Sequence, residues 1–358
     1  MSCGFGSSFF PTRSTPSGLP TSAASRESLF ADTSPSWRRK ATTSGIDTAP
    51  FFKSFVSPFG RFMKTLRVAL TGGRGRVAPF VAAHLCSSQA EVVTFSRRAG
   101  DGFQCTSLLT EPGALATFDV VLHLGWSTVP LTSEEMPGVE GITDLPLLQE
   151  LLDSCASIRR PPLLVFFSSA AVYGNTSAAA VEDTPCQPVG HYARAKLQAE
   201  DLIRSACGRH ETLRCCALRI SNLFGSAMQS TKPQGLISRV CRAIHENTPI
   251  SIWGDGGNTK DYLFLDDFLD ALEIIVDRGL TGTFNVASER SLSVEEIVSL
   301  VESSAGKKLK LVHCPAFPWD VEESRISAQK LRAATGWRAR SDIAEAIQQV
   351  IEAELKCV

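Results

Sequence analysis

From residue 66 onward, short apolar runs alternate with longer segments of helical spacing, and this alternation constrains the fold more than any other feature. Continuous apolar or β-branched runs are typical of buried strands, whereas apolar residues at every third or fourth position are typical of helices. Strands that alternate with helices favour a parallel sheet covered on both faces. The pattern therefore predicts an α/β fold built on a doubly wound parallel sheet.

The expected elements follow from these patterns. Helix 142–156 contains Pro146, which we expect in its first turn because proline further in removes a helical hydrogen bond. After about residue 226, helices and loops dominate, which predicts a smaller second lobe at 229–358. We expect strands at 66–71, 91–96, 119–125, 162–169, 214–221 and 281–288, and helices at 77–88, 142–156, 191–207 and 293–306.

Residues 1–62 lack this alternation. They are rich in Ser, Thr, Pro and Gly and show no apolar period, so we expect a disordered segment. Two interpretations stay open. An acid-poor, Ser-rich leader with Arg38 and Arg39 fits an organelle transit peptide, whereas Met63, directly before the first strand, indicates an extension without a role. We favour the extension and therefore a cytoplasmic location.

Composition excludes several classes of protein. The net charge of −1 is well mixed, and no apolar run approaches the length of a membrane span, so we expect neither a nucleic-acid nor a membrane partner. The eleven cysteines show no C-x-x-C motif and no zinc-ligand spacing. We therefore expect reduced thiols and no metal site.

A glycine-rich turn, TGGRGRVA at 71–78, lies between the first expected strand and the first expected helix. Gly72, Gly75 and Ala78 form a G-x-x-G-x-x-A pattern, in which glycines allow the backbone to approach a pyrophosphate at the helix N-terminus. The turn predicts a dinucleotide site, and we assign Arg74 and Arg76 to it as well. Residues 63–228, with about 258–288 folding back, would then form a Rossmann-type NAD(P)-binding domain.

The second strand ends in Arg97 and Arg98, with no acidic residue beside them. In such folds an Asp or Glu at this place binds the ribose of NAD, whereas an arginine accommodates the 2′-phosphate of NADP. Two solvated loop charges are the simpler alternative. We expect NADP or NAD as cofactor and favour NADP.

The stretch HYARAK, at 191–196, places Tyr192 four residues before Lys196. On a helix these side chains share one face. A nearby positive charge lowers the pKa of a phenol, so the pair predicts a general base. Ser168 and Ser169 end an apolar strand, at the edge where such sheets bind ligands.

Six motifs occur in the order found in extended short-chain dehydrogenases/reductases: TGGRGRVA, HLGWST, FFSSAAVYG, YARAK, RISNLFG and GDGGNTKDYLFLDD. The chain resembles most the NAD-dependent epimerase/dehydratase branch, which includes UDP-glucose 4-epimerase. The resemblance implies that Tyr192 is the catalytic acid/base, that Lys196 lowers its pKa and holds the nicotinamide ribose, and that Ser169 orients the reacting oxygen. It also assigns Leu124 and Gly125 to the cofactor, and Trp126, Asn222 and Lys260 to the substrate.

The resemblance implies hydride transfer at a secondary alcohol or ketone, with a nucleotide-sugar epimerase as the first hypothesis. Alanines at 170 and 171 replace the Asp-Glu pair of 4,6-dehydratases and argue against that reaction. Two alternatives stay open, an NADPH-dependent reductase of a non-sugar carbonyl and a non-catalytic NADP-binding sensor. In the family, helices equivalent to 142–156 and 191–207 form a dimer interface, so a homodimer is expected.

The leader hypothesis leads to a first prediction. A chain that begins at Met63 should unfold at the same temperature as the full-length chain, because residues 1–62 bury too little apolar surface to offset their conformational entropy. Thermal unfolding followed by circular dichroism measures this. A clearly lower melting temperature for the shortened chain would contradict it.

Overall fold

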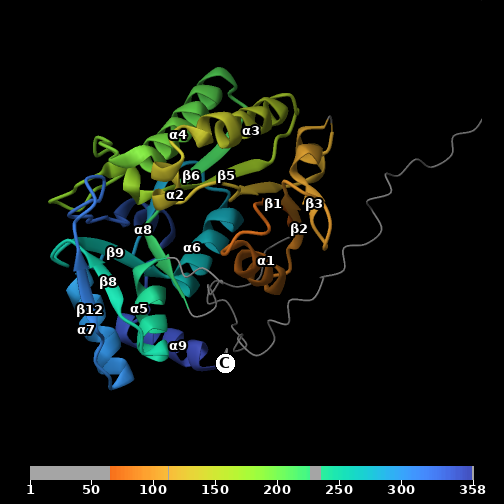
Figure 1. Cartoon of the computed structure of the whole chain (residues 1–358). Coiled ribbons are helices and arrows are strands. Elements are labelled where there is room, and N and C mark those ends of the chain that lie inside the picture. Colours follow the sequence, from red (N-terminus) through yellow and green to blue (C-terminus); the bar gives the residue numbers. More distant parts are fainter. Residues whose placement is uncertain (1–64, 112, 226–234, 357–358) are drawn as a thin grey trace, which may run out of the picture. The chain divides into compact units, whose positions relative to one another are not determined.

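The computed structural model describes residues 65–111, 113–225 and 235–356 (Figure 1). The segment 1–62, expected to be disordered, lies outside these residues. Within them, seven parallel strands form the main sheet in the order β3-β2-β1-β4-β5-β6-β10. Its strands are β1 (Arg67–Thr71), β2 (Glu91–Ser96), β3 (Gln104–Cys105), β4 (Val120–His123), β5 (Leu163–Ser169), β6 (Arg214–Ile220) and β10 (Gly282–Val286).

The strand order explains where a ligand site forms. β2 and β3 extend the sheet from β1 in one direction, whereas β4, β5 and β6 extend it in the other. The direction of winding therefore reverses between β1 and β4, and open parallel sheets bind ligands outside the carboxyl ends of the strands at such a point. This arrangement confirms the doubly wound, Rossmann-type fold.

Helices cover both faces of the main sheet (Figure 1). On one face, α1 (Ala78–Ser87) and α6 (Leu265–Arg278) pack their apolar sides against β1, β4, β5, β6 and β10. On the other face, α3 (Val139–Ala156) and α4 (Gly190–Arg209) form a second core with β1, β2, β4, β5 and β6. The interior strands are buried on both sides, which is why they are continuous apolar runs in the sequence.

The C-terminal part of the chain builds a separate core and two small sheets. The sheets have the strand orders β11-β9-β7 and β12-β8, and α5, α7 and α9 pack beside them. Their bounds are β7 (Asn222–Phe224), β8 (Ile250–Trp253), β9 (Thr259–Phe264), β11 (Ser291–Ser293), β12 (Leu311–Cys314), α5 (Leu236–Glu246), α7 (Val294–Ala305) and α9 (Ile343–Lys356). The exact division into domains at 228 stays a prediction.

Short elements complete the part of the chain that the structure describes. The expected strands and helices are all present, with bounds shifted by a few residues. The shorter elements are α2 (Pro130–Glu135), α8 (Gln329–Thr335) and the 3₁₀ turns η2 (Thr106–Thr110), η3 (Leu115–Thr117) and η4 (Ala170–Tyr173).

The expected place of Pro146 in a first helical turn is wrong. α3 begins at Val139, after Gly138 in a left-handed conformation, so Pro146 lies inside the helix. Its ring removes the N–H that would bond to the carbonyl of Ile142. Ile142 is 80% exposed, so water can solvate that carbonyl. In a single chain, water therefore offsets part of the lost hydrogen bond.

The glycine-rich turn at 71–78 closely approaches the residues directly after β4, and this leads to a second prediction. Gly72 has φ +72°, and a Cβ atom there would lie 2.7 Å from the Gly125 nitrogen. Gly72→Ala should lower the free energy of unfolding by about 1–3 kcal/mol through backbone strain alone. Urea unfolding measures this. Gly208→Ala is the control, because Gly208 lies on α4 and a Cβ atom there would meet open space. An equal effect of both changes would contradict the backbone strain inferred at Gly72.

Candidate active site

The glycine-rich turn has the geometry that a dinucleotide pyrophosphate requires. The Gly73 N–H donates to the Phe95 carbonyl at 2.8 Å, and the Gly75 N–H donates to the Gly72 carbonyl at 2.7 Å. A Cβ atom on Gly75 would lie 2.9 Å from that same carbonyl oxygen. In the described residues, no side chain caps the N-terminus of α1. These bonds close the turn tightly in front of the N-terminus of α1, where uncapped backbone N–H groups can face a phosphate, which fits the predicted cofactor.

The end of β4 is tied to this turn. Thr71 Oγ1 lies 2.8 Å from His123 Nδ1, and the Gly125 N–H donates to the same hydroxyl at 3.2 Å. Burial, followed by the charge of Lys196, lowers the pKa of His123 to about 3. The imidazole is therefore neutral at physiological pH. These contacts hold Leu124 and Gly125 beside the glycine turn, and their assignment to the cofactor stays a prediction.

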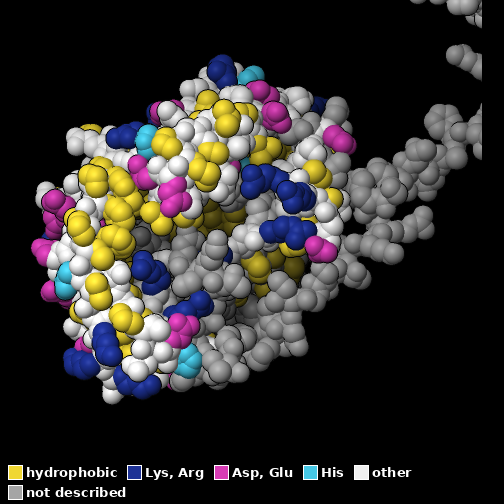
Figure 2. Space-filling model, viewed as in Figure 1, with side chains coloured by type: hydrophobic (Ala, Val, Ile, Leu, Met, Phe, Trp, Pro, Cys, Tyr) yellow, Lys and Arg dark blue, Asp and Glu magenta, His cyan; other side chains and the backbone are white. Residues whose placement is uncertain are grey.

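Basic side chains gather over the end of the sheet that contains β2 and β3 (Figure 2). Arg97 and Arg98 are exposed just beyond β2. Arg74 lies 4.6 Å from the Phe103 ring centroid and pairs with Asp101 at 3.0 Å. Burial lowers the pKa of Arg76. Of the arginines predicted for the cofactor, Arg74 and Arg76 thus lie in the glycine turn, and Arg97 and Arg98 come directly after β2. Arg74 already has a carboxylate partner.

A cavity of about 140 Å³ opens beyond the ends of β5 and β6. Four of the residues predicted for catalysis or substrate binding line it: Ser169, Tyr192, Asn222 and Lys260. They come from four different elements, namely β5, α4, β7 and β9. The fold therefore brings together side chains that lie far apart in the sequence. The other residues that line the cavity are Pro130, Glu134, Ala170, Ala171, Gly174, Val189, Gly190, Ala193, Ile220, Ser221, Trp319, Asp320, Val321 and Ser324.

Lys196 and Trp126 are not among the lining residues. The Lys196 ammonium donates to the Phe167 carbonyl at 2.8 Å and lies 3.7 Å from the Trp126 ring centroid. It is 5.7 Å from the Tyr192 ring centroid. Lys196 therefore joins α4 to β5 beside the cavity, and Trp126 covers its charge by a cation–π contact.

The expected lowering of the Tyr192 pKa is wrong for this structure. Burial raises the pKa of the Tyr192 phenol, and the charge of Glu140 raises it further. Burial also lowers the pKa of Lys196 to about 7, against the opposing charges of Asp144, Glu200 and Glu140. The helical spacing places both groups on one face as expected, but burial is the largest cause of both pKa shifts, and the charge that acts on Tyr192 is the negative one of Glu140.

The remaining predicted residues already have partners. Ser169 Oγ accepts from the Ala171 N–H at 3.2 Å, and Asn222 Nδ2 donates to the Asp261 carbonyl at 2.9 Å. Lys260 Nζ lies 3.1 Å from Asp320 Oδ1 and also bonds to the Val321 carbonyl. Burial lowers the pKa of Lys260, with Asp320 opposing. An anionic substrate group must therefore compete with Asp320 for this lysine.

Glu134, Trp319 and Asp320 are among the lining residues that sequence reasoning missed. Glu134 of α2 accepts from the His191 N–H at 2.5 Å and so caps the start of α4 next to Tyr192. Trp319 and Asp320 come from the segment after β12. Neither segment has a periodic pattern or a motif of known chemistry, so no sequence signal pointed to them.

Elsewhere in the described residues, His84 of α1 lies near Asp270 and Glu273 of α6. Their ligand-type atoms are within 4.8 Å of one another, close enough to surround a cation. His84 Nε2 and Glu273 Oε2 already pair at 2.9 Å, so the group serves as a contact between helices. Within the same residues, no helix has the length and apolarity that crossing a membrane requires.

Comparison with curated proteins finds UDP-glucose 4-epimerases. That of Mycolicibacterium smegmatis is 25% identical over 248 residues, which cover 67% of this chain and 78% of the relative. That of Azospirillum brasilense is 29% identical, over 50% of this chain and 56% of the relative. The chain thus matches only a little over half the length of the second relative.

Solved structures share the fold. UDP-glucose 4-epimerase of Thermus thermophilus, in complex with NAD, matches with a TM-score of 0.73 at 24% identity, over 82% of this chain and all of the other. UDP-glucuronic acid 4-epimerase of Bacillus cereus, with UDP-glucuronic acid and NAD, matches with a TM-score of 0.73 at 20% identity, over the same shares.

The model of one protein family matches residues 68–287. The matched segment runs from β1 to the end of β10, so it contains the glycine turn, the strand end with Ser169, and the helix with Tyr192 and Lys196. It covers more than half of the chain. The chain belongs to the NAD dependent epimerase/dehydratase family.

Proposed function

We propose that the protein is a nucleotide-sugar 4-epimerase, which inverts a secondary alcohol on the sugar through a keto intermediate. One observation carries this proposal: the cavity at the carboxyl ends of the strands is lined by both Ser169 and Tyr192. A serine and a tyrosine that line one cavity suit a substrate oxygen that loses and regains a proton. The names of the curated relatives support the sugar nucleotide as substrate class.

In the proposed reaction, Tyr192 takes the proton from the substrate hydroxyl and later returns it to the same oxygen, so the bound ligands must first offset the burial that keeps its phenol protonated. Ser169 hydrogen-bonds that oxygen and fixes its place. Lys196 stabilises the phenolate when it is charged, and it orders the ribose beside it. When bound at the glycine turn, a nicotinamide dinucleotide supplies the acceptance and return of hydride that inversion of an alcohol requires.

The choice between NAD and NADP is part of the proposal. Arg97 and Arg98 follow β2 without a carboxylate at the strand end, which favours the 2′-phosphate of NADP. The related solved structures named above contain NAD. Titration of the protein with NADH and NADPH, followed by nicotinamide fluorescence, decides between the two.

Two experiments test the function. A panel of UDP-, GDP- and dTDP-sugars, with products identified by NMR, should show inversion at C4 of one class. Native mass spectrometry should show a retained, oxidised dinucleotide, because an epimerase regenerates its cofactor in each cycle. A released, exchangeable cofactor together with net reduction of a carbonyl would instead indicate a reductase. Binding without turnover of any sugar would indicate a sensor.

The proposed base leads to a third prediction. Tyr192→Phe keeps the ring but removes the proton-carrying oxygen, so the rate should fall by about 10²–10⁴-fold. Turnover of the confirmed substrate measures this. A variant with near-normal turnover would show that another group is the base.

Two further variants separate the roles around Tyr192. Ser169→Ala should lower the rate with little effect on dinucleotide affinity, because its hydroxyl is assigned to the substrate oxygen. Lys196→Met should lower both the rate and the affinity, since its ammonium is assigned to both the phenolate and the ribose. A loss of dinucleotide affinity in Ser169→Ala, or an unchanged affinity in Lys196→Met, would contradict these assignments.

We also propose a homodimer through α3 and α4. These helices border an open groove lined by Leu145, Pro146 and Leu202, among others, and Ile142 on α3 is 80% exposed. A two-fold axis along the groove would bury the same surface on both copies.

A fourth prediction tests this assembly. Ile142→Glu should convert the dimer to a monomer at micromolar concentration, because a carboxylate would be buried between the copies. Light scattering measures the mass. Val312→Glu, at a position 49% exposed on β12, is the matched control and should stay dimeric. A wild-type chain that is monomeric would contradict the proposal.

A further inference from the structure

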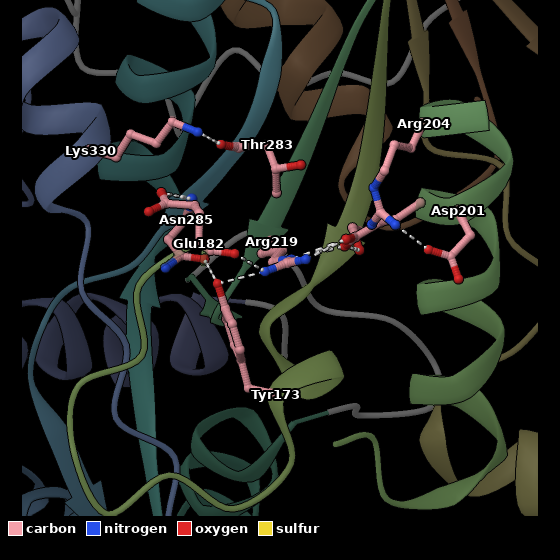
Figure 3. Close-up of polar contacts among 10 residues, drawn as sticks. Tyr173, Glu182, Asp201, Arg204, Arg219, Thr283, Asn285 and Lys330 are labelled. Atoms are coloured by element: carbon pink, nitrogen blue, oxygen red, sulfur yellow. Dashed lines mark hydrogen bonds and ion pairs between the residues drawn. The ribbon is translucent and has the colours of Figure 1, made fainter. Parts of the chain in front are cut away.

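A buried polar network joins β5, β6 and α4 beside the cavity. Glu200 of α4 accepts from Ser168 Oγ at 2.5 Å and from Arg219 Nη2 at 2.7 Å. Arg219 Nη1 donates to the Tyr173 hydroxyl at 2.9 Å (Figure 3). That hydroxyl donates to Asn285 Oδ1 at 2.7 Å. These five residues are called the Glu200 network below.

The network is rigid and almost dry. The side chains of Arg219 and Glu200 are only 4% and 2% exposed. Arg219 Nε also donates to both carboxylate oxygens of Glu200, at 3.1 and 3.2 Å, which fixes the two groups in one plane. Burial raises the pKa of Tyr173 to about 12, so its hydroxyl stays protonated and keeps donating. A displacement of any member would leave a buried charge or donor without a partner.

The network lies one helical turn from the proposed catalytic residues. Tyr192, Lys196 and Glu200 follow one another at four-residue steps, so they share one face of α4. Lys196 bonds to the carbonyl of Phe167, and Glu200 bonds to the side chain of Ser168. Two successive turns of α4 therefore hold two successive residues of β5. This double contact fixes both the rotation of α4 and its position along the strand.

The next residue of β5 is Ser169, and both Ser169 and Tyr192 line the cavity. No hydrogen bond between these two side chains occurs in the described structure, so their relative position depends on the contacts between α4 and β5. Glu200 itself does not line the cavity. We propose that Glu200, held by Arg219, is a positioning residue that keeps Tyr192 in register with Ser169, an inference that rests on the proposed function.

Kinetics of Glu200→Gln give the first test. The amide still accepts a hydrogen bond but no longer carries the charge that fixes Arg219. Loosened alignment of reacting groups should lower kcat by about 10–100-fold, with KM changed by less than about 3-fold because Glu200 touches no substrate. Glu273→Gln is the matched control. Glu273 is also a buried carboxylate that pairs with a basic side chain, but its partner is His84 on α1, so kcat should stay within about 2-fold.

Ser168→Ala is a second variant, should Glu200→Gln not fold. It leaves the Arg219–Glu200 pair intact and removes only the bond between β5 and α4. We expect a smaller loss of kcat, of about 3–10-fold, again without a matching change in KM. If both folded variants turn over like Glu273→Gln, Glu200 has a structural role only and the inference is overturned.

A substrate-independent measurement separates this inference from the proposed function. The Lys196 ammonium lies against Trp126, so loss of its proton should change the fluorescence of Trp126. The signal of Trp126 is the part of the fluorescence that is lost in Trp126→Phe. Lys196 faces Glu140 and Asp144 of α3, Glu200 of its own helix, and His123 of β4. The midpoint of this titration therefore reports the surroundings of Lys196 even if no sugar is turned over.

The two variants should move this midpoint in opposite directions. Glu200→Gln removes one negative charge and leaves Arg219 uncompensated, so the midpoint should fall. Ser168→Ala changes no charge but loosens α4, so water should reach the ammonium and the midpoint should rise. Glu273→Gln should leave it unchanged. A midpoint that moves in neither variant overturns the positioning role. A wild-type protein that turns over no sugar refutes only the proposed function.

Discussion

The ion pair between Arg219 and Glu200 is the contact on which the arrangement of the candidate site depends. Loss of one partner from a buried pair typically costs about 3–5 kcal/mol, a large share of the roughly 5–15 kcal/mol that stabilises a domain. The pair connects a central strand to the helix that carries Tyr192, and through Tyr173 it reaches the edge strand β10. The stability of the sheet and the geometry of the site are therefore set by the same atoms.

Local patterns in the sequence predicted most of the fold. The apolar runs that became β1, β4, β5 and β6 are buried on both faces, so their composition indicates their place directly. The turn at Gly72 was predictable because close backbone approach leaves no space for a side chain. Spacing on one helix also placed Tyr192 and Lys196 on one face. Each of these features is decided within a few neighbouring residues.

The features that could not be predicted depend on contacts between distant segments. Trp319 reaches the cavity from the segment after β12, and Glu134 reaches it from a two-turn helix without an apolar period. The pKa values of Tyr192 and Lys196 follow from how deeply the finished fold buries them, which no local spacing encodes. Burial favours the neutral form of each group. A ligand that brings hydroxyl groups to Lys196 would favour its charged form and so couple ligand binding to proton uptake.

The position of β10 has a consequence for how the protein folds during synthesis. β10 completes the main sheet by pairing with β6, yet β7, β8, β9, α5 and α6 lie between these two strands in the chain. Until β10 leaves the ribosome, the edge of β6 has unpaired N–H and carbonyl groups, which invite pairing with other chains. Asn285, which anchors the Tyr173 hydroxyl, arrives with the same strand. The first domain therefore closes only after much of the second lobe has been made, and this long-range pairing favours slow folding.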